Sequence, residues 1–202
     1  MEERLEENSL AGRTTQAASV VGGMILLMWG LEVLDWLMPG DPLDHWGIVP
    51  RTWGGFLRIP LAPFLHGGFV HLISNTLPLA VLGGIIMLRS AAEFFSVTTI
   101  VVLAAGLGTW LIGGSNTVHL GASSLVFGYF GFLLLRAWFD RSILSLLIGV
   151  AVFFVYGGII WGVLPLTFGV SWEGHLCGLL GGVLAARIIS QTNNANTVRK
   201  NS

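Results

Sequence analysis

The sequence predicts an all-α protein that crosses a lipid membrane several times. Of its 202 residues, 53% are hydrophobic and only 10% are charged, whereas soluble domains carry about 25% charged residues. The mean hydropathy is +0.77, and six apolar segments approach the roughly 20 residues that a helix needs to cross the hydrocarbon core. These observations favour a polytopic membrane protein with a bundle of six transmembrane helices.

The six expected helices are separated by short turns, except after the first. They span residues 18–38, 70–88, 94–112, 123–139, 143–161 and 172–189. The long connection at 39–69 carries aromatic residues, which favour the membrane–water interface. We expect a single domain over 18–190, between a cytoplasmic N-terminal tail (1–17) and a polar, disordered cytoplasmic tail (191–202).

The distribution of Lys and Arg predicts the orientation in the cell membrane. An even number of spans places both termini on one side, and that side holds every Lys and Arg except Arg51 and Arg58. Because cytoplasmic loops carry the excess of positive charge, we expect both termini in the cytoplasm and the 39–69 connection outside.

Charge and cysteine content exclude several classes of function. A net charge of −1 gives no basic excess that would favour nucleic acid as a partner. The single cysteine, Cys177, excludes an internal disulfide and a cysteine-rich metal site, and we expect it to pack within the bundle. The sequence therefore predicts no cofactor and no metal, and it leaves the oligomeric state open.

Polar and ionisable residues inside a span are functional candidates, because they are costly to bury in lipid. Four of them share one depth, since the second, fourth and sixth spans all run from outside to inside. They are His71, Asn75, Ser123 and His175. A serine hydroxyl becomes a good nucleophile only beside a base, and histidine titrates near neutral pH. The pattern predicts Ser123 as nucleophile and His175 as its base.

The same four residues contain donors for a developing negative charge. His71 and Asn75 are four positions apart, so they share one helical face and could both donate to a tetrahedral oxyanion. Ser123 at a helix N-terminus would add its backbone N–H. Small residues would let the fourth and sixth helices approach closely, although ordinary helix packing explains them equally well. They are Gly121, Gly128 and Gly131 near the fourth span, and Gly174, Gly178, Gly181 and Gly182 in the sixth.

The remaining polar residues have structural interpretations. We expect His66 to tie down the outer loop, and His45 and His119 to be exposed loop residues. Glu173 lies two positions from His175, so their side chains diverge on the helix, and Glu173 is expected to be solvated at the interface.

A separate acidic pair lies near the outer end of the first span. Glu32 and Asp35 share one helical face. We expect them to bond to the long outer connection and assign them no catalytic role.

Three segments resemble the rhomboid family of intramembrane serine proteases. LRIPLAPFLHGGFVHLISN (57–75) is similar to the family's Trp-Arg and His-x-x-x-x-His-x-x-x-Asn motif, GASS (121–124) to Gly-x-Ser-Gly, and GHLCG (174–178) to Ala-His-x-x-Gly. The matching positions of the first motif hold Arg58, His66, His71 and Asn75. All three segments occur in the family's order and on the expected spans.

The resemblance implies a six-helix rhomboid bundle whose active site opens to the outer face. It implies a Ser123–His175 dyad without a third acid, and an oxyanion hole made of the Ser123 backbone N–H and the side chains of His71 and Asn75. Substrates would be single-pass transmembrane proteins in the lipid bilayer, entering near the fifth span and residues 162–171. Residues with structural roles near the site would be Gly121, Phe127, Gly178, Arg58 and His66.

Four positions depart from the family's pattern, and none of them removes a catalytic group. Leu57 stands where the family has Trp, and Ser124 where it has Gly after the serine. The acidic residue that the family often has near the end of the second span is replaced around Met87. Phe127 stands where the family often has Tyr, and it could still stack on His175.

Two other functions stay open. A non-enzymatic relative would bind transmembrane helices, although such relatives generally lack the serine or the histidine that this chain keeps. A small transporter or channel would use Glu32, Asp35 and the histidines, although the paired repeats typical of transporters are not visible.

Overall fold

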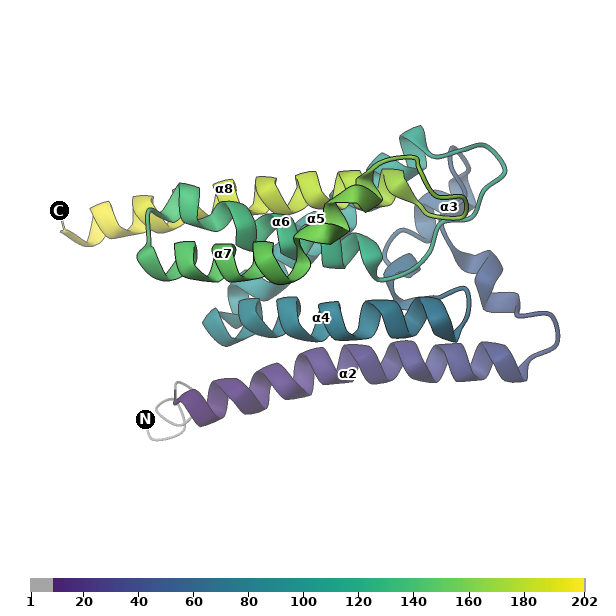
Figure 1. The fold of residues 1–202 in the computed structure, drawn as a ribbon, viewed down its shortest axis with the longest axis horizontal. Coiled ribbons are helices and arrows are strands. Elements are labelled where there is room, and N and C mark those ends of the chain that lie inside the picture. The colour runs from purple at the N-terminus through teal and green to yellow at the C-terminus, as the bar shows by residue number, and fades with distance from the viewer. Residues whose placement is uncertain (1–8, 202) are drawn as a thin grey trace.

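The computed structural model describes the backbone of residues 9–201 and the side chains of residues 9–193. Its longer elements are all helices (Figure 1). In chain order they are α2 (Leu10–Leu37), η1 (Pro42–Trp46), α3 (Trp53–Leu57), η2 (Ala62–Phe64), α4 (Phe69–Arg89), α5 (Ala91–Ile112), α6 (Ser123–Asp140), α7 (Ile143–Tyr156), η3 (Gly157–Val163) and α8 (Trp172–Asn201). Every apolar segment of the sequence therefore forms a helix.

Three of the long helices begin at serines that cap them. The side chain of Ser9 accepts a hydrogen bond from the backbone of Gly12, and Ser90 and Ser142 make the equivalent bonds at the starts of α5 and α7. A serine at this position satisfies one of the backbone N–H groups that the first turn leaves without a partner. Ser90 and Ser142 lie in the short turns between α4 and α5 and between α6 and α7.

Four helical segments are long and apolar enough to cross a membrane: α2, α4, α5 and the combined segment Ile143–Val163. Within the described residues, α6 and α8 do not meet that criterion. Both are central: α6 contacts α4, α5, α7 and α8, and its largest contact is with α8. A helix that faces other helices needs less apolar surface than one that faces lipid. Length and hydropathy thus identify four candidate spans, and the count of six stays a prediction.

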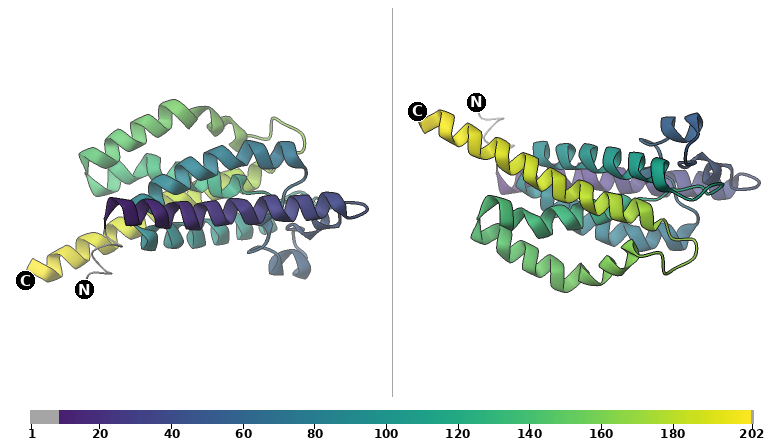
Figure 2. Two further views of the ribbon diagram at one scale, coloured as in Figure 1. Left: turned by 90° about the horizontal axis from the view of Figure 1, so that it is seen from below. Right: turned by 90° about the horizontal axis from the view of Figure 1, so that it is seen from above.

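The connections between the helices lie at two opposite ends of the bundle (Figure 1). The start of α2 and the end of α8 lie at one end, whereas α3 and the connection between η3 and α8 lie at the other. Both views in Figure 2 show the same division, with the last turns of α8 extending beyond the other helices.

The prediction of a disordered tail after Ser190 is wrong for the backbone, because α8 continues to Asn201. No Gly or Pro follows Gly182 to end the helix. A helix that is already nucleated extends at little cost, so the polar residues continue α8 past the bundle.

Buried charges close the end of the bundle where α2 begins. Arg136 of α6 pairs with Glu93 of α5, with 2.8 Å between Nη2 and Oε1, and with Asp140 one turn later. Arg89 at the end of α4 also pairs with Asp140, at 2.8 Å. Arg89 thus finds its counter-charges on α5 and α6, although Met87 occupies the region of α4 where the resemblance leads us to expect an acid.

Glycines bring α6 and α8 into backbone contact. A Cβ on Gly182 would overlap the carbonyl oxygen of Gly128, and a Cβ on Gly178 would overlap that of Ser124. A Cβ on Gly131 would stand 2.6 Å from the carbonyl oxygen of Leu179. The predicted close approach of these two helices is therefore confirmed, and it depends on the absence of side chains at the contact.

We predict that Gly182→Ala lowers the unfolding midpoint in detergent, with a loss of about 1–3 kcal/mol from overpacking. The obstacle is a backbone oxygen, which cannot move away as a flexible side chain can. Gly84→Ala in α4 is the matched control, because nothing lies within 4 Å of the position its Cβ would take. Its better helix propensity should leave stability unchanged or raised by up to about 1 kcal/mol. Equal effects of the two substitutions would contradict this account.

Candidate active site

The segment that leads into Ser123 is held from three sides. The backbone N–H of Gly121 donates to the carbonyl of Ala62 at 2.9 Å, and that of Ala122 donates to Nε2 of His66 at 3.3 Å. Gly121 has φ 115°, a conformation that favours glycine, and a Cβ there would stand 2.5 Å from the His71 ring. Ser123, half-buried, then starts α6.

His175 lies in the first turn of α8 and is buried. Its Nδ1 is 2.9 Å from the carbonyl oxygen of Gly162. Because a carbonyl only accepts, Nδ1 carries the proton of the neutral ring and Nε2 is left with its lone pair. The carbonyl of Gly162 therefore holds His175 in the tautomer that a general base needs.

Phe127 fixes the plane of the His175 ring. The two rings stack with centroids 4.1 Å apart and an angle of 10°, as expected from the sequence. Phe127 lies one turn after Ser123, so both side chains share a face of α6. His175 therefore lies against the face that carries Ser123. Within the described residues the two form no direct hydrogen bond, and such bonds often tighten only when substrate is bound.

His71 and Asn75 reach the same region from α4. The His71 ring contacts Gly121 and lies 5.1 Å, between ring centroids, from His66. Asn75 is buried, and its Nδ2 has no hydrogen-bond partner among the described residues. An unpaired buried donor costs about 1–3 kcal/mol, so the amide is available to an acceptor that arrives with a ligand.

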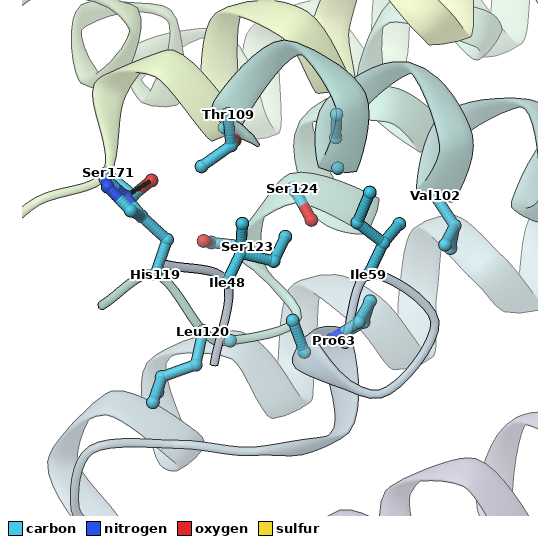
Figure 3. Close-up of a pocket in the computed structure, with 15 residues that line it drawn as sticks. Ile48, Ile59, Pro63, Val102, Thr109, His119, Leu120, Ser123, Ser124 and Ser171 are labelled. Atoms are coloured by element: carbon cyan, nitrogen blue, oxygen red, sulfur yellow. Dashed lines mark hydrogen bonds between the residues drawn. The ribbon is translucent and has the colours of Figure 1, made fainter. Parts of the chain in front are cut away.

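A small cavity with a mostly apolar wall and a few polar groups lies beside Ser123 (Figure 3). Its volume of about 30 Å³ exceeds the roughly 10–15 Å³ that one water molecule requires. Its polar lining comes from Thr109, His119, Ser123, Ser124 and Ser171. His71, Asn75 and His175 do not line it. Among the described residues, no three His, Cys, Asp or Glu side chains are grouped to hold a metal ion.

Comparison with known proteins identifies the family of the chain. A family model described as Rhomboid domain matches residues 53–192. The chain belongs to the rhomboid family. Together with its apolar helices, this makes it a multi-pass membrane protein. The rhomboid match covers α3 to α8 and begins after α2.

Relatives of this rhomboid chain occur in bacteria and plants. An uncharacterised protein of Mycobacterium tuberculosis is 43% identical over 184 residues, which cover 85% of this chain and 76% of that protein. A Bacillus subtilis protein, named provisionally as a rhomboid protease, is 26% identical over 186 residues, covering 83% and 89%. RHOMBOID-like protein 4 of Arabidopsis thaliana is 28% identical over 190 residues, covering 91% of this chain and 41% of its own length.

Arg58 supports the connection between α2 and α4 in the rhomboid chain. Arg58 donates to the carbonyl of His45 at 2.9 Å and lies over the Trp46 ring at 5.3 Å, while Leu57 is exposed. Asp35 accepts from the backbone of Leu43 at 2.7 Å. The expectation that the acidic end of the first span bonds to this connection is confirmed for Asp35.

Two expectations are wrong. His119 is buried rather than exposed, with its ring bonded to Thr117 and Ser171. Glu173 is only 6% exposed rather than solvated. For His119, the bonds to Thr117 and Ser171 hold the ring between two loops. His45 is exposed as expected, and Cys177 packs against Gly108 of α5.

Sequence reasoning missed Thr109 and Ser171, which line the cavity beside Ser123. Thr109 is 2% exposed within α5, and a polar residue inside a predicted span is a signal that could have found it. Ser171 lies in a loop that precedes α8 and carries no local signal of its partner, His119, 52 positions earlier.

We predict that His66 makes the stability of this rhomboid chain depend on pH. Burial and the neighbouring His71 lower the pKa of His66 to about 4, whereas an unfolded histidine titrates near pH 6.5. Only the unfolded state then binds a proton between these values, so stability falls as the pH drops from about 6.5 to 4. The full loss amounts to about 3 kcal/mol. The unfolding midpoint in detergent should show this slope, and His66→Gln should reduce it.

The exposed His45 provides the control for this measurement. His45→Gln should leave the slope of the wild type unchanged. A slope that His66→Gln leaves intact would assign the pH dependence to other groups.

Proposed function

We propose that this rhomboid chain is an intramembrane serine endopeptidase. It would hydrolyse a peptide bond within or next to the transmembrane segment of single-pass membrane proteins. Membership of the rhomboid family supports the reaction class. The observation that carries the proposal is the placement of His175, whose Nδ1 bonds to the Gly162 carbonyl while its ring stacks on Phe127, one turn from Ser123.

The first half of the reaction would use Ser123 as nucleophile. Its Oγ attacks the scissile carbonyl carbon as Nε2 of His175 takes the hydroxyl proton. The backbone N–H of Ser123 and the side chains of His71 and Asn75 would donate to the oxyanion that develops. Collapse of the tetrahedral intermediate breaks the C–N bond, the proton on His175 passes to the leaving amine, and an acyl ester remains on Ser123.

The second half needs one water molecule. The cavity beside Ser123 offers space for it, and Thr109, His119 and Ser171 supply polar groups at its wall. The water attacks the ester carbonyl while His175 takes its proton, and the same oxyanion donors act again. The C–O bond to Ser123 breaks, the carboxylic product leaves, and the proton returns to the serine.

The proposal includes the arrangement in the membrane. Six spans would comprise the four hydropathic segments together with α6 and α8, with both termini in the cytoplasm of the cell membrane and the site open to the outer face. The charge distribution supports this orientation. The segment with the highest hydropathy, Ile143–Val163, is also the least buried of the four, which supports substrate entry beside it and beside residues 162–171.

The central test is Ser123→Ala in proteoliposomes that contain a single-pass substrate. We expect cleavage to fall to background while the unfolding midpoint stays that of the wild type. Ser96→Ala, on the exposed surface of α5, is the control and should cleave normally. Cleavage retained by Ser123→Ala would contradict the proposal. If the wild type and Ser123→Ala bind the substrate equally and neither cuts it, the protein is instead a non-enzymatic binder of transmembrane helices.

Asn75→Ala separates a catalytic role of the amide from a structural one. Loss of an oxyanion donor should reduce kcat by about 10²–10³-fold. Because Nδ2 has no partner in the described structure, its removal should leave the unfolding midpoint unchanged or raise it. A clear loss of stability with normal kcat would assign Asn75 to packing.

A further inference from the structure

One hydrogen bond joins the two segments that lead to the proposed catalytic residues. Nδ1 of His119 lies 2.6 Å from Oγ of Ser171 (Figure 3). His119 stands four residues before Ser123, and Ser171 stands four residues before His175. The carbonyl of Ser171 also accepts from the backbone N–H of His175 at 3.1 Å. The bond therefore connects the approach to α6 with the first turn of α8.

The direction of this bond follows from its neighbours. Oγ1 of Thr117 donates its only proton to the carbonyl of Gly114 at 2.6 Å. The same Oγ1 lies 2.7 Å from Nε2 of His119, so it must accept there, and Nε2 carries the ring proton. Nδ1 is then the acceptor, and the hydroxyl of Ser171 donates to it.

The surroundings keep His119 in this form. The side chain is buried, and burial lowers its pKa, with Glu173 of α8 acting in the opposite direction. The backbone of His119 is fixed as well, because it exchanges hydrogen bonds of 2.7 and 2.9 Å with Ile48. Nδ1 of His119 is thus a fixed acceptor for the hydroxyl of Ser171.

The loop before α8 has few other attachments. Most residues of the loop 164–170 are exposed. Its described backbone hydrogen bonds join only residues within the loop or at its two ends. Ser171 is where this loop is bonded to the α5–α6 connection. Gly174 leaves room for the contact, since a Cβ there would stand 3.0 Å from Oγ of Ser171.

We propose that His119 is a positioning residue: by accepting from Ser171 it fixes the start of α8, and with it His175, relative to Ser123. This inference rests on the proposed function. His119 and Ser171 line the same cavity as Ser123, which places the bond beside the reaction without contact to the reacting atoms.

The test measures the reaction of a fluorophosphonate probe with Ser123 in the full chain, as a maximal inactivation rate and a half-saturating concentration. Ser171→Ala and His119→Gln both remove the bond; the glutamine reaches toward Thr117 but leaves the Nδ1 position empty. Each should lower the maximal rate about 10- to 100-fold with the half-saturating concentration unchanged. The double variant should be no slower than either single variant, because both remove the same interaction.

Conservative and control variants separate positioning from folding. His119→Asn places an oxygen near the Nδ1 position and should recover at least part of the rate. His45→Gln, at an exposed histidine, should react as the wild type does. Unfolding midpoints confirm that each variant is folded, and Ser171→Ala, which removes one hydroxyl, keeps the test valid if His119→Gln does not fold.

The possible failures are distinguishable. If the wild type is not labelled at Ser123, or if labelling does not depend on His175, the proposed function fails. If the wild type is labelled but folded Ser171→Ala and His119→Gln react at its rate, only the inference about His119 is overturned. Additive losses in the double variant, or a change confined to the half-saturating concentration, would overturn it as well.

Discussion

The backbone contact between α6 and α8 determines where the chemistry of this protein can occur. Gly178 and Gly182 let the axis of α8 approach α6 until carbonyl oxygens of one helix occupy the space of missing side chains on the other. Two helices at this separation bring their first turns together as well. Ser123 begins one helix and His175 lies in the first turn of the other, so the contact is the condition for any interaction between them.

The same contact explains why the two central helices are the least lipid-like. The interface between α6 and α8 requires glycine and accepts serine, and the first turns carry polar residues that a lipid-facing helix could not. The outer helices compensate with large apolar side chains on the surface, such as Val70, Leu77 and Phe154. Apolar side chains thus form the exterior of the bundle, while the first turns of α4, α6 and α8 hold the polar site.

Much of this arrangement could be predicted from the sequence, because the membrane restricts the options. Runs of about 20 apolar residues can form little else than helices, and the shared depth of His71, Ser123 and His175 follows from the alternation of spans. Contacts between loops could not be predicted in this way. The burial of His119 depends on Ser171, 52 positions away, and neither residue stands in a periodic pattern. The helical continuation to Asn201 departs from the expectation for another reason, since polar composition favours disorder only where no helix already leads into the segment.

The partner of His175 shows how the membrane shapes the proposed mechanism. A base must be held in one tautomer, and many soluble serine hydrolases use a carboxylate for this purpose. A carboxylate would add a charge that is best stabilised by counter-charges, as Asp140 is by Arg89 and Arg136 at the opposite end of the bundle. The carbonyl of Gly162 accepts from Nδ1 without introducing a charge, and Phe127 restricts the ring plane by apolar contact. Glu173, although buried close by, makes no described hydrogen bond to His175, so orientation of the base rests on a neutral dipole and a ring stack. Such a pair suits an apolar bundle, where an additional unpaired charge would cost more than it contributes.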